Sequence, residues 1–261
     1  MLFSWLRNRR RRSLLAEPFP EAWLATLHEH VGHYEVLPAA DQKKLRDAVQ
    51  IMLSEKDWEG CRGLELTDDM RVTIAALAAV LILGLDDFYF DNVVTILVYP
   101  NAYVVKEERA LGGGATIEGE SDRLGEAHYR GPVILSWAEI HENALAPGYG
   151  QNLVFHEFAH QLDMLNGAFD GTPNLPNDEL AKRWADLMDR EFRRLQAAER
   201  RGRDTLLDPY GATDPAEFFA VATECFFDAP RAMQREYPPL YKLFCDYFRQ
   251  DPATWKPFEE H

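Results

Sequence analysis

Apolar residues recur at intervals of three and four along the first third of the chain, over 19–37 and 39–61. This spacing places the apolar side chains on one face of a helix, so both stretches are expected to be helical. The following stretch, from Val72 to Leu85, is apolar on all sides. It predicts a buried helix, because a bilayer-spanning helix needs about 20 such residues.

The pattern changes in the middle of the chain. β-Branched and aromatic residues dominate 91–105 and 130–137, and Asn, Pro and Gly flank both runs, as is typical of strands. The glycine-rich stretch between them is expected to form a loop or an edge hairpin. Helical spacing then returns over four segments, about 151–165, 177–200, 215–228 and 236–249. Helices flanking a small group of strands predict an α+β fold that is mainly helical.

Composition limits the partners and the domain organisation. The chain has 261 residues, of which 46% are hydrophobic, and a formal net charge of −15. An acidic surface argues against direct binding of nucleic acid, since phosphate contacts need basic residues. We expect a basic tail over 1–18 and a single domain over 19–261. Its upper part is expected over about 19–165 and its lower, helical part over about 166–261.

The basic run near residue 10 does not form an export signal. In MLFSWLRNRRRRSLL the short apolar piece precedes the arginines, whereas a secretory signal has the opposite order. The arginines are compatible with contact to acidic lipid, but a solvated tail is the simpler interpretation. Cys61, Cys225 and Cys245 form an odd set without C-x-x-C spacing, which favours reduced thiols and a cytosolic protein.

The stretch HEFAHQLD, which begins at His156, carries the strongest chemical signal. His156 and His160 are four residues apart, so on a helix they project from one face and can converge on one ion. Glu157 lies beside that face. In the H-E-x-x-H arrangement two neutral imidazoles bind zinc, and the carboxylate acts as general base toward a water molecule. Two buried histidines satisfied by hydrogen bonds are the alternative.

A second histidine-rich stretch, LHEHVGH, has the wrong spacing for a metal site. His28 and His33 are five residues apart, about 140° around a helix, with Gly32 between them. We therefore interpret this cluster as surface histidines or as buried histidines that are satisfied by hydrogen bonds.

A third ligand must come from a downstream carboxylate. Glu217 and Glu224 are seven residues apart on a helix that is otherwise apolar, where unpaired carboxylates are rare. Glu217 also completes a capping box that starts at Asp214. Glu224 is either a ligand or an acceptor that orients a ligand histidine. Spacing leaves both open, whereas three other candidates fall on a charged helix face and are weaker: Glu179, Glu191 and Glu199.

HEFAHQLD followed by DPYGATDPAEFFAVATECFF resembles the Mlc titration factor A family of bacterial zinc peptidases, whose catalytic half is similar to that of anthrax lethal factor. The resemblance extends from FPEAWLATL to DYFRQDP. It implies a zincin-like fold of the gluzincin type, with a small mixed sheet above the motif helix. It also implies Zn²⁺ bound by His156, His160 and Glu217, with Glu157 as catalytic base. Tyr210, seven residues before the third ligand, is expected to face the metal.

Three further roles are expected on weaker grounds. Asp163 is expected either to accept a hydrogen bond from a ligand imidazole or a backbone group, or to be an ordinary surface aspartate. The segment Gly125–Trp137 is a candidate sheet edge that holds an extended substrate. The glycines Gly112–Gly114 form either a flap over the site or an idle surface loop.

Together these patterns predict a cytoplasmic zinc metallopeptidase that acts on a peptide or protein substrate. The resemblance implies aminopeptidase-like action and, in some relatives, binding to the glucose repressor Mlc. We expect no membrane span. The alternative is a regulatory protein that sequesters a transcription factor, with a structural or vestigial zinc site. A structural site needs a fourth protein ligand and has no use for Glu157.

Overall fold

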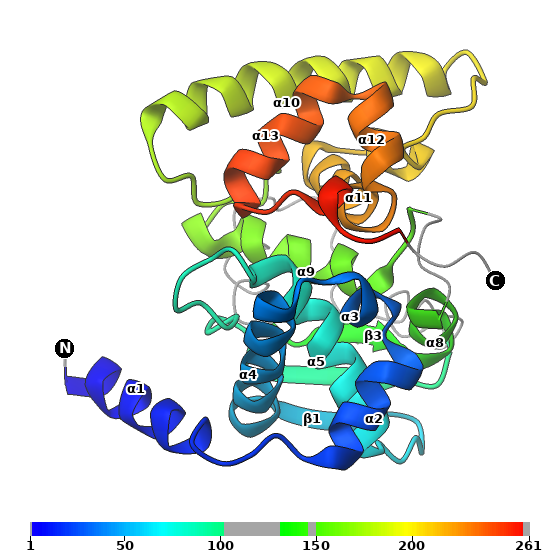
Figure 1. Cartoon of the computed structure of the whole chain (residues 1–261). Coiled ribbons are helices and arrows are strands. Elements are labelled where there is room, and N and C mark those ends of the chain that lie inside the picture. Colours follow the sequence, from blue (N-terminus) through cyan, green and yellow to red (C-terminus); the bar gives the residue numbers. More distant parts are fainter. Residues whose placement is uncertain (1, 102–130, 146–149, 258–261) are drawn as a thin grey trace.

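The computed structural model describes residues 2–101, 131–145 and 150–257, and in it two groups of elements lie on opposite sides of helix α9 (Leu153–Asp163) (Figure 1). One group comes from the first half of the chain and contains the sheet. The other is helical and comes from the second half. Helix α9 contacts both groups, so its side chains lie where they meet.

The first group begins with the predicted helices. The stretch 19–37 forms two helices that are separated at Val31. The stretch 39–61 forms one long helix, and a short strand follows near its end. The predicted buried helix is confirmed, and it starts where the Thr67 side chain accepts a hydrogen bond from the Met70 backbone. These helices are α2 (Glu21–His30), α3 (Gly32–Val36), α4 (Ala39–Glu55) and α5 (Asp68–Ile82). Among the helices of the described ranges, none is both long and apolar enough to cross a bilayer.

Within the described ranges the sheet has three strands, β1 (Asp57–Gly60), β2 (Thr95–Tyr99) and β3 (Val133–Ser136), in the order β1-β2-β3. The two predicted strand regions contain β2 and β3. Strand β1 lies in a stretch that was predicted to be helical, so that prediction was wrong at its end. DWEG has little strand propensity of its own, and its pairing with β2 supplies the stabilisation.

The prediction of a mixed sheet was also wrong for the described strands, because both pairings are parallel. Parallel neighbours need a crossover connection, which α5 provides between β1 and β2. Of the candidate sheet edge Gly125–Trp137, the described part contains β3 and the first residue of α8 (Trp137–Leu145). The rest of that segment and the candidate flap Gly112–Gly114 lie outside the described residues.

The second group contains three predicted helices and a short one that was not predicted. Trp184 joins them, because its ring stacks on Phe244 at 5.5 Å and meets the edge of Phe219 at 5.6 Å. The predicted helices are α10 (Asp178–Glu199), α11 (Pro215–Asp228) and α13 (Pro238–Phe248), and the extra one is α12 (Pro230–Glu236). The described part of the chain also contains three single turns: η1 (Met164–Asn166), η2 (Pro209–Ala212) and η3 (Pro252–Thr254).

The basic stretch forms helix α1 (Leu2–Leu14). Arg11 is buried, and its guanidinium donates two hydrogen bonds to Glu55, at 2.9 and 2.6 Å, and one to Asp91. The expected solvation was therefore wrong for Arg11, although other arginines of the helix are exposed. A buried guanidinium is stable here because two carboxylates compensate its charge.

Two glycines after α9 offer a matched test of close packing. Gly167 and Gly171 both have positive φ, 85° and 76°. A Cβ on Gly167 would meet nothing within 4 Å, whereas a Cβ on Gly171 would lie 2.2 Å from the Pro215 carbonyl oxygen. Gly167→Ala is expected to cost about 1 kcal/mol for the left-handed backbone. Gly171→Ala should cost about 3 kcal/mol, because the start of α11 must also move. Urea unfolding measures both, and equal losses would contradict the close approach.

Candidate metal centre

Helix α9 holds His156 and His160 in a fixed orientation. The Asn152 side chain caps the helix by accepting a hydrogen bond from the Phe155 backbone at 3.2 Å. At the other end, turn η1 leads to Gly167 in the left-handed conformation, which ends the helical stretch close to residue 165, as predicted. The opposite face of α9 is buried against the sheet side of the molecule. The two imidazoles therefore project from one face, one turn apart.

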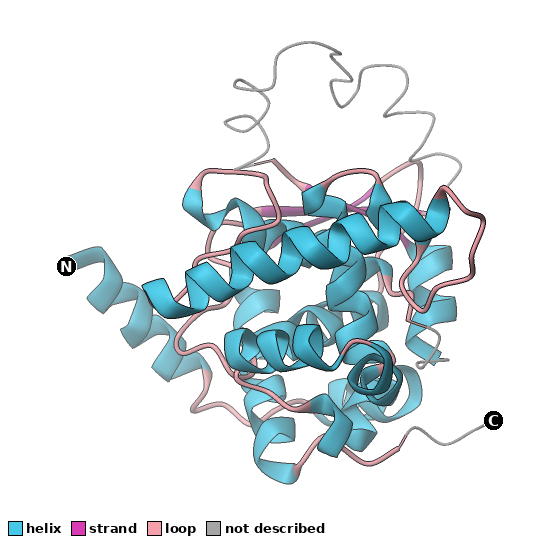
Figure 2. Ribbon diagram, turned by 90° about the horizontal axis from the view of Figure 1, so that it is seen from above, coloured by secondary structure: helices cyan, strands magenta, loops and turns pink. Residues whose placement is uncertain are grey.

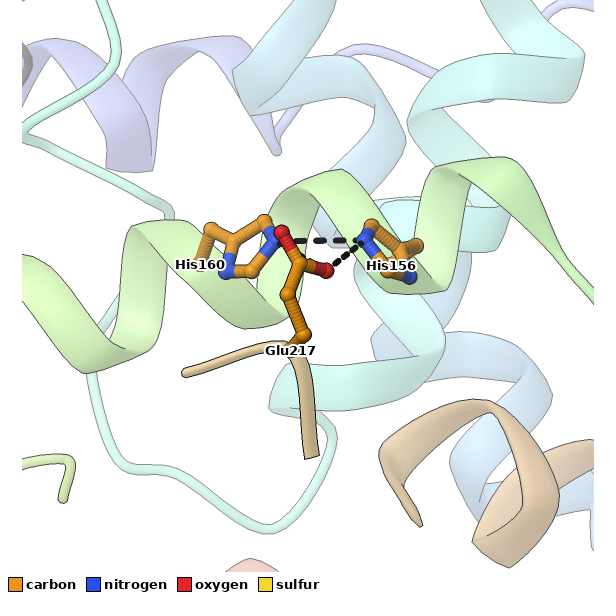
Figure 3. A group of neighbouring side chains, drawn as sticks. All are labelled: His156, His160 and Glu217. Atoms are coloured by element: carbon orange, nitrogen blue, oxygen red, sulfur yellow. Dashed lines mark hydrogen bonds and ion pairs between the residues drawn. The ribbon is translucent and has the colours of Figure 1, made fainter. Parts of the chain in front are cut away.

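Helix α11 brings a carboxylate to that face. Asp214 caps the helix by accepting hydrogen bonds from the backbone of Ala216, at 2.9 Å, and of Glu217, at 3.0 Å. The predicted cap is thus confirmed for Asp214. The Glu217 side chain, however, points to the imidazoles of α9 (Figure 3). The two interpretations of Glu217 therefore do not exclude each other, because its backbone takes part in the cap and its side chain joins the histidines.

Three donor atoms converge between the helices. Glu217 Oε2 lies 2.9 Å from His156 Nε2 and 3.5 Å from His160 Nε2, and the two nitrogens are 3.2 Å apart. In a tetrahedral zinc site with bonds of 2.0–2.1 Å, neighbouring ligand atoms are about 3.3 Å apart. The observed separations fit that shape. Among the described residues this is the group of three ligand-type side chains close enough to share one ion.

The electrostatics of the group favour a positive charge at its centre. Burial opposes protonation of His156, but hydrogen bonds to Glu217 and Glu224 outweigh it and raise the pKa of His156 to about 10. The negative charge of Glu157 acts in the same direction. Burial acts against ionisation of Glu217, but the two imidazoles hold its pKa well below the usual range. The same atoms suit a divalent cation, which would take the place of the proton.

Glu224 orients the first histidine from behind. Its Oε1 lies 2.8 Å from His156 Nδ1, and its Oε2 accepts a hydrogen bond of 2.6 Å from the Asn152 backbone. A carboxylate at Nδ1 selects the tautomer that carries its proton on Nδ1, so the lone pair of Nε2 is available to a metal ion. Burial raises the pKa of Glu224, and the hydrogen bonds from His156 and Asn152 act against this shift. Of the two open roles for Glu224, the geometry favours the orienting acceptor.

A third carboxylate of α11 fixes the segment that leads into α9. Asp228 is buried, and its Oδ2 accepts a hydrogen bond of 2.9 Å from the Gly150 backbone. Its Oδ1 lies 3.3 Å from Nε2 of the buried His33. His28, by contrast, pairs with Glu35 at the surface. The LHEHVGH stretch thus contains surface and buried histidines, as expected, and His33 helps to join the two halves of the molecule.

Two exposed aromatic rings flank the histidines. The Tyr210 ring centre lies 6.0 Å from that of His156, and the Phe169 ring centre lies 5.0 Å from that of His160. Both rings remain about half exposed, at 55% and 48%. Asp163 holds the loop that carries Phe169, because its Oδ2 accepts a hydrogen bond of 2.9 Å from the Gly171 backbone. Asp163 therefore binds a backbone group, one of its expected roles, and burial raises its pKa to about 6.

The structure brings together the candidate ligands that spacing could only suggest. The three side chains supply two imidazole nitrogens and one carboxylate oxygen, a set that can hold a divalent metal and leave a position open. Glu157, the next residue after His156, is half-buried on the same helix. Sequence reasoning missed three contributors: Asn152, Phe169 and Asp228. An asparagine before an apolar helix signals a cap, so Asn152 could have been found. Asp228 depends on packing between distant segments, and the place of Phe169 depends on how the loop after α9 folds back.

Comparisons with known proteins agree with this chemistry. The family model described as glucose-regulated metallo-peptidase M90 matches residues 5–249. An uncharacterized protein of Synechocystis is 36% identical over 249 residues, which cover 95% of this chain and 90% of the relative. The Mlc titration factor A of Yersinia enterocolitica is 30% identical, covering 96% and 91% of the two chains. That of Yersinia pestis is 31% identical, covering 96% and 90%.

The two glutamates of α11 should differ in their effect on metal affinity. Glu217→Gln weakens a direct donor, whereas Glu224→Gln disturbs only the orientation of His156. We expect Glu224→Gln to lower Zn²⁺ affinity about 10–100-fold, and Glu217→Gln to lower it further. Competition with a chelating dye measures both. Glu191→Gln is a control, since Glu191 is as buried as Glu224 but pairs with Arg190 and Arg194. A larger loss of Zn²⁺ affinity for Glu224→Gln than for Glu217→Gln would contradict the assignment of Glu217 as the ligand.

Proposed function

Because this chain belongs to the glucose-regulated metallo-peptidase M90 family, we propose that it is a zinc-dependent peptidase with aminopeptidase-like action on short substrates. The observation that supports this most directly is the convergence of His156, His160 and Glu217 on one point. Zinc is the proposed metal, since two imidazoles and one carboxylate form a common catalytic zinc set. The cytosol is the proposed location, supported by an odd number of cysteines without C-x-x-C spacing.

Bound to these three side chains, zinc would polarise the scissile carbonyl and lower the pKa of a water molecule. Glu157 removes a proton from the attacking water as the water oxygen bonds to the carbonyl carbon. The carbonyl π electrons move onto its oxygen. As the C–N bond breaks, Glu157 returns the proton to the leaving nitrogen, so that one carboxyl group and one amine result. Glu224 keeps the His156 imidazole in place throughout.

Tyr210 is proposed to stabilise the negative oxygen of the tetrahedral intermediate. Its ring lies beside His156, and turn η2 holds its backbone, since the Tyr210 N–H donates a hydrogen bond of 2.8 Å to Asp208. Turn η2 packs directly on α11, which carries Glu217. A phenol at this position can donate a hydrogen bond where charge develops, and such donors contribute strongly to rate.

We also propose a zincin-like arrangement in which an extended substrate pairs with the sheet above α9. Strand β3 is at an edge of the described sheet and contacts α9, and it belongs to the segment Gly125–Trp137 that was expected to serve this role. Main-chain pairing at a sheet edge binds extended peptides with little dependence on side chains. The division into an upper part, about 19–165, and a lower part, about 166–261, belongs to this proposal.

A second proposed function is binding of a transcriptional regulator, as the name Mlc titration factor A of the relatives suggests. The glucose repressor Mlc, or a regulator like it, is the proposed partner. In this alternative the metal site is structural or vestigial. The two functions separate in one comparison, because Glu157→Gln should remove turnover if the protein is a peptidase and should leave regulator binding intact if it is a binding protein.

Glu157→Gln tests the peptidase proposal directly. Loss of the base should lower kcat about 10²–10⁴-fold, whereas the metal ligands are unchanged. Zinc content and turnover of a peptide library are measured on the parent, on Glu157→Gln and on His160→Ala. We expect about one zinc per chain in the first two and almost none in the third. Parent-like turnover by Glu157→Gln would refute the mechanism, and a parent without zinc would favour the regulatory function.

Tyr210→Phe removes one hydroxyl beside the site. If the phenol stabilises the oxyanion, kcat should fall about a hundredfold with little change in KM or in zinc content. Steady-state kinetics on one substrate measure the split. A rise in KM alone would show that Tyr210 contacts the substrate without acting on the reacting oxygen.

A further inference from the structure

Helix α1 carries an exposed face that the proposed peptidase function does not use. Figures 1 and 2 both show this helix extending away from the rest of the molecule. Its sequence, LFSWLRNRRRRSL, contains five arginines and no acidic residue. The whole chain nevertheless has a net charge of −15. Helix α1 is thus a basic element on an otherwise acidic protein, whose remaining part is here called the acidic body.

One side of α1 contacts the rest of the molecule. Arg7 and Arg11 are four residues apart and share this side. Arg7 forms an ion pair with Asp91 at 3.1 Å, and Arg11 is paired with both Glu55 and Asp91. The Arg11 guanidinium also lies 4.7 Å from the centre of the Tyr89 ring. These contacts fix the rotation of the helix about its axis, so the opposite side is held toward solvent.

The outward side combines apolar and cationic side chains. Trp5 and Leu6 are 53% and 48% exposed, and the only other exposed large apolar side chains among the described residues are Val94, Phe169 and Tyr210. Arg9 and Arg12 continue the same side toward the end of the helix. Arg10 lies at its flank, where it is exposed and donates a hydrogen bond of 3.4 Å to the Ser54 carbonyl oxygen. The Arg9 guanidinium lies 5.6 Å from the centre of the Trp5 ring.

We propose that the outward side of α1 binds the surface of a bilayer that contains anionic phospholipid. Tryptophan and leucine insert at the boundary between headgroups and acyl chains, while arginines on the same side reach the phosphates. Nucleic acid fits less well, because an aliphatic side chain such as Leu6 has no role there. With 13 residues α1 is about 20 Å long, suited to lying on a bilayer and too short to cross it.

The acidic body does not prevent this contact. At physiological ionic strength, charges separated by more than about 8 Å are largely screened. Because α1 extends away from the rest of the molecule, its outward side can approach the lipid before the acidic body does. A single amphipathic helix gives weak, reversible attachment. The metal centre is on other helices and stays accessible to solvent.

Vesicle flotation tests the proposal. The full chain is mixed with vesicles of phosphatidylcholine alone, or of equal parts phosphatidylcholine and phosphatidylglycerol. We expect binding to the anionic vesicles only, and weaker binding at higher salt. The variant Arg9→Gln, Arg10→Gln, Arg12→Gln should bind about a hundredfold more weakly. Trp5→Ser with Leu6→Ser should also bind more weakly, although its charge is unchanged.

The chain provides a charge-matched control. Arg200, Arg201 and Arg203 are exposed at the end of α10, and their triple substitution by Gln should leave vesicle binding as in the parent. Circular dichroism confirms that each variant is folded. Equal losses in the two triple variants, or no binding of the parent to anionic vesicles, would overturn the proposal. Binding of a single-stranded oligonucleotide without binding of vesicles would also overturn it, in favour of a nucleic acid site.

Discussion

The His156 imidazole between two carboxylates of α11 is the contact on which the rest of the structure depends. Glu217 approaches one ring nitrogen and Glu224 the other. Burying these carboxylates would be costly without charged partners, so the two helices are stable together only in a narrow range of relative positions. The same contact leaves the Nε2 atoms and Glu217 Oε2 converging on one point. The electrostatic requirement of the fold and the geometry of the metal centre are thus met by the same atoms.

The surrounding elements keep this contact from shifting. On one side, Glu224 and Asp228 hold the backbone at Asn152 and Gly150, where the chain enters α9. On the other, Asp163 holds the Gly171 backbone, and Gly171 packs against the first residue of α11. Both ends of α9 are therefore tied to α11 or to its start. A site held by packed helices and buried hydrogen bonds keeps its geometry better than one on loops.

The distribution of charge separates two regions of the protein. Carboxylates surround the candidate metal centre, where they favour a cation, while a separate helix holds a dense group of arginines. Arg11 shows how the two signs are combined, since one buried arginine anchors the helix to the acidic body and leaves its neighbours for solvent. The proposed lipid surface and the metal centre can therefore act without interfering with each other.

The sequence by itself determined what depends on near neighbours. The four-residue spacing of His156 and His160, the Asp214 cap and the Gly167 stop all follow from helix geometry, and the structure has each of them. The tertiary structure decided what depends on distant segments. Packing between helices placed Glu217, and not Glu224, at the open face of the histidines. Strand pairing made the described sheet parallel and formed β1 from a sequence of weak strand propensity. Contacts between distant segments also buried Arg11. These outcomes are set by pairing and burial between segments far apart in the chain, which local periodicity does not encode.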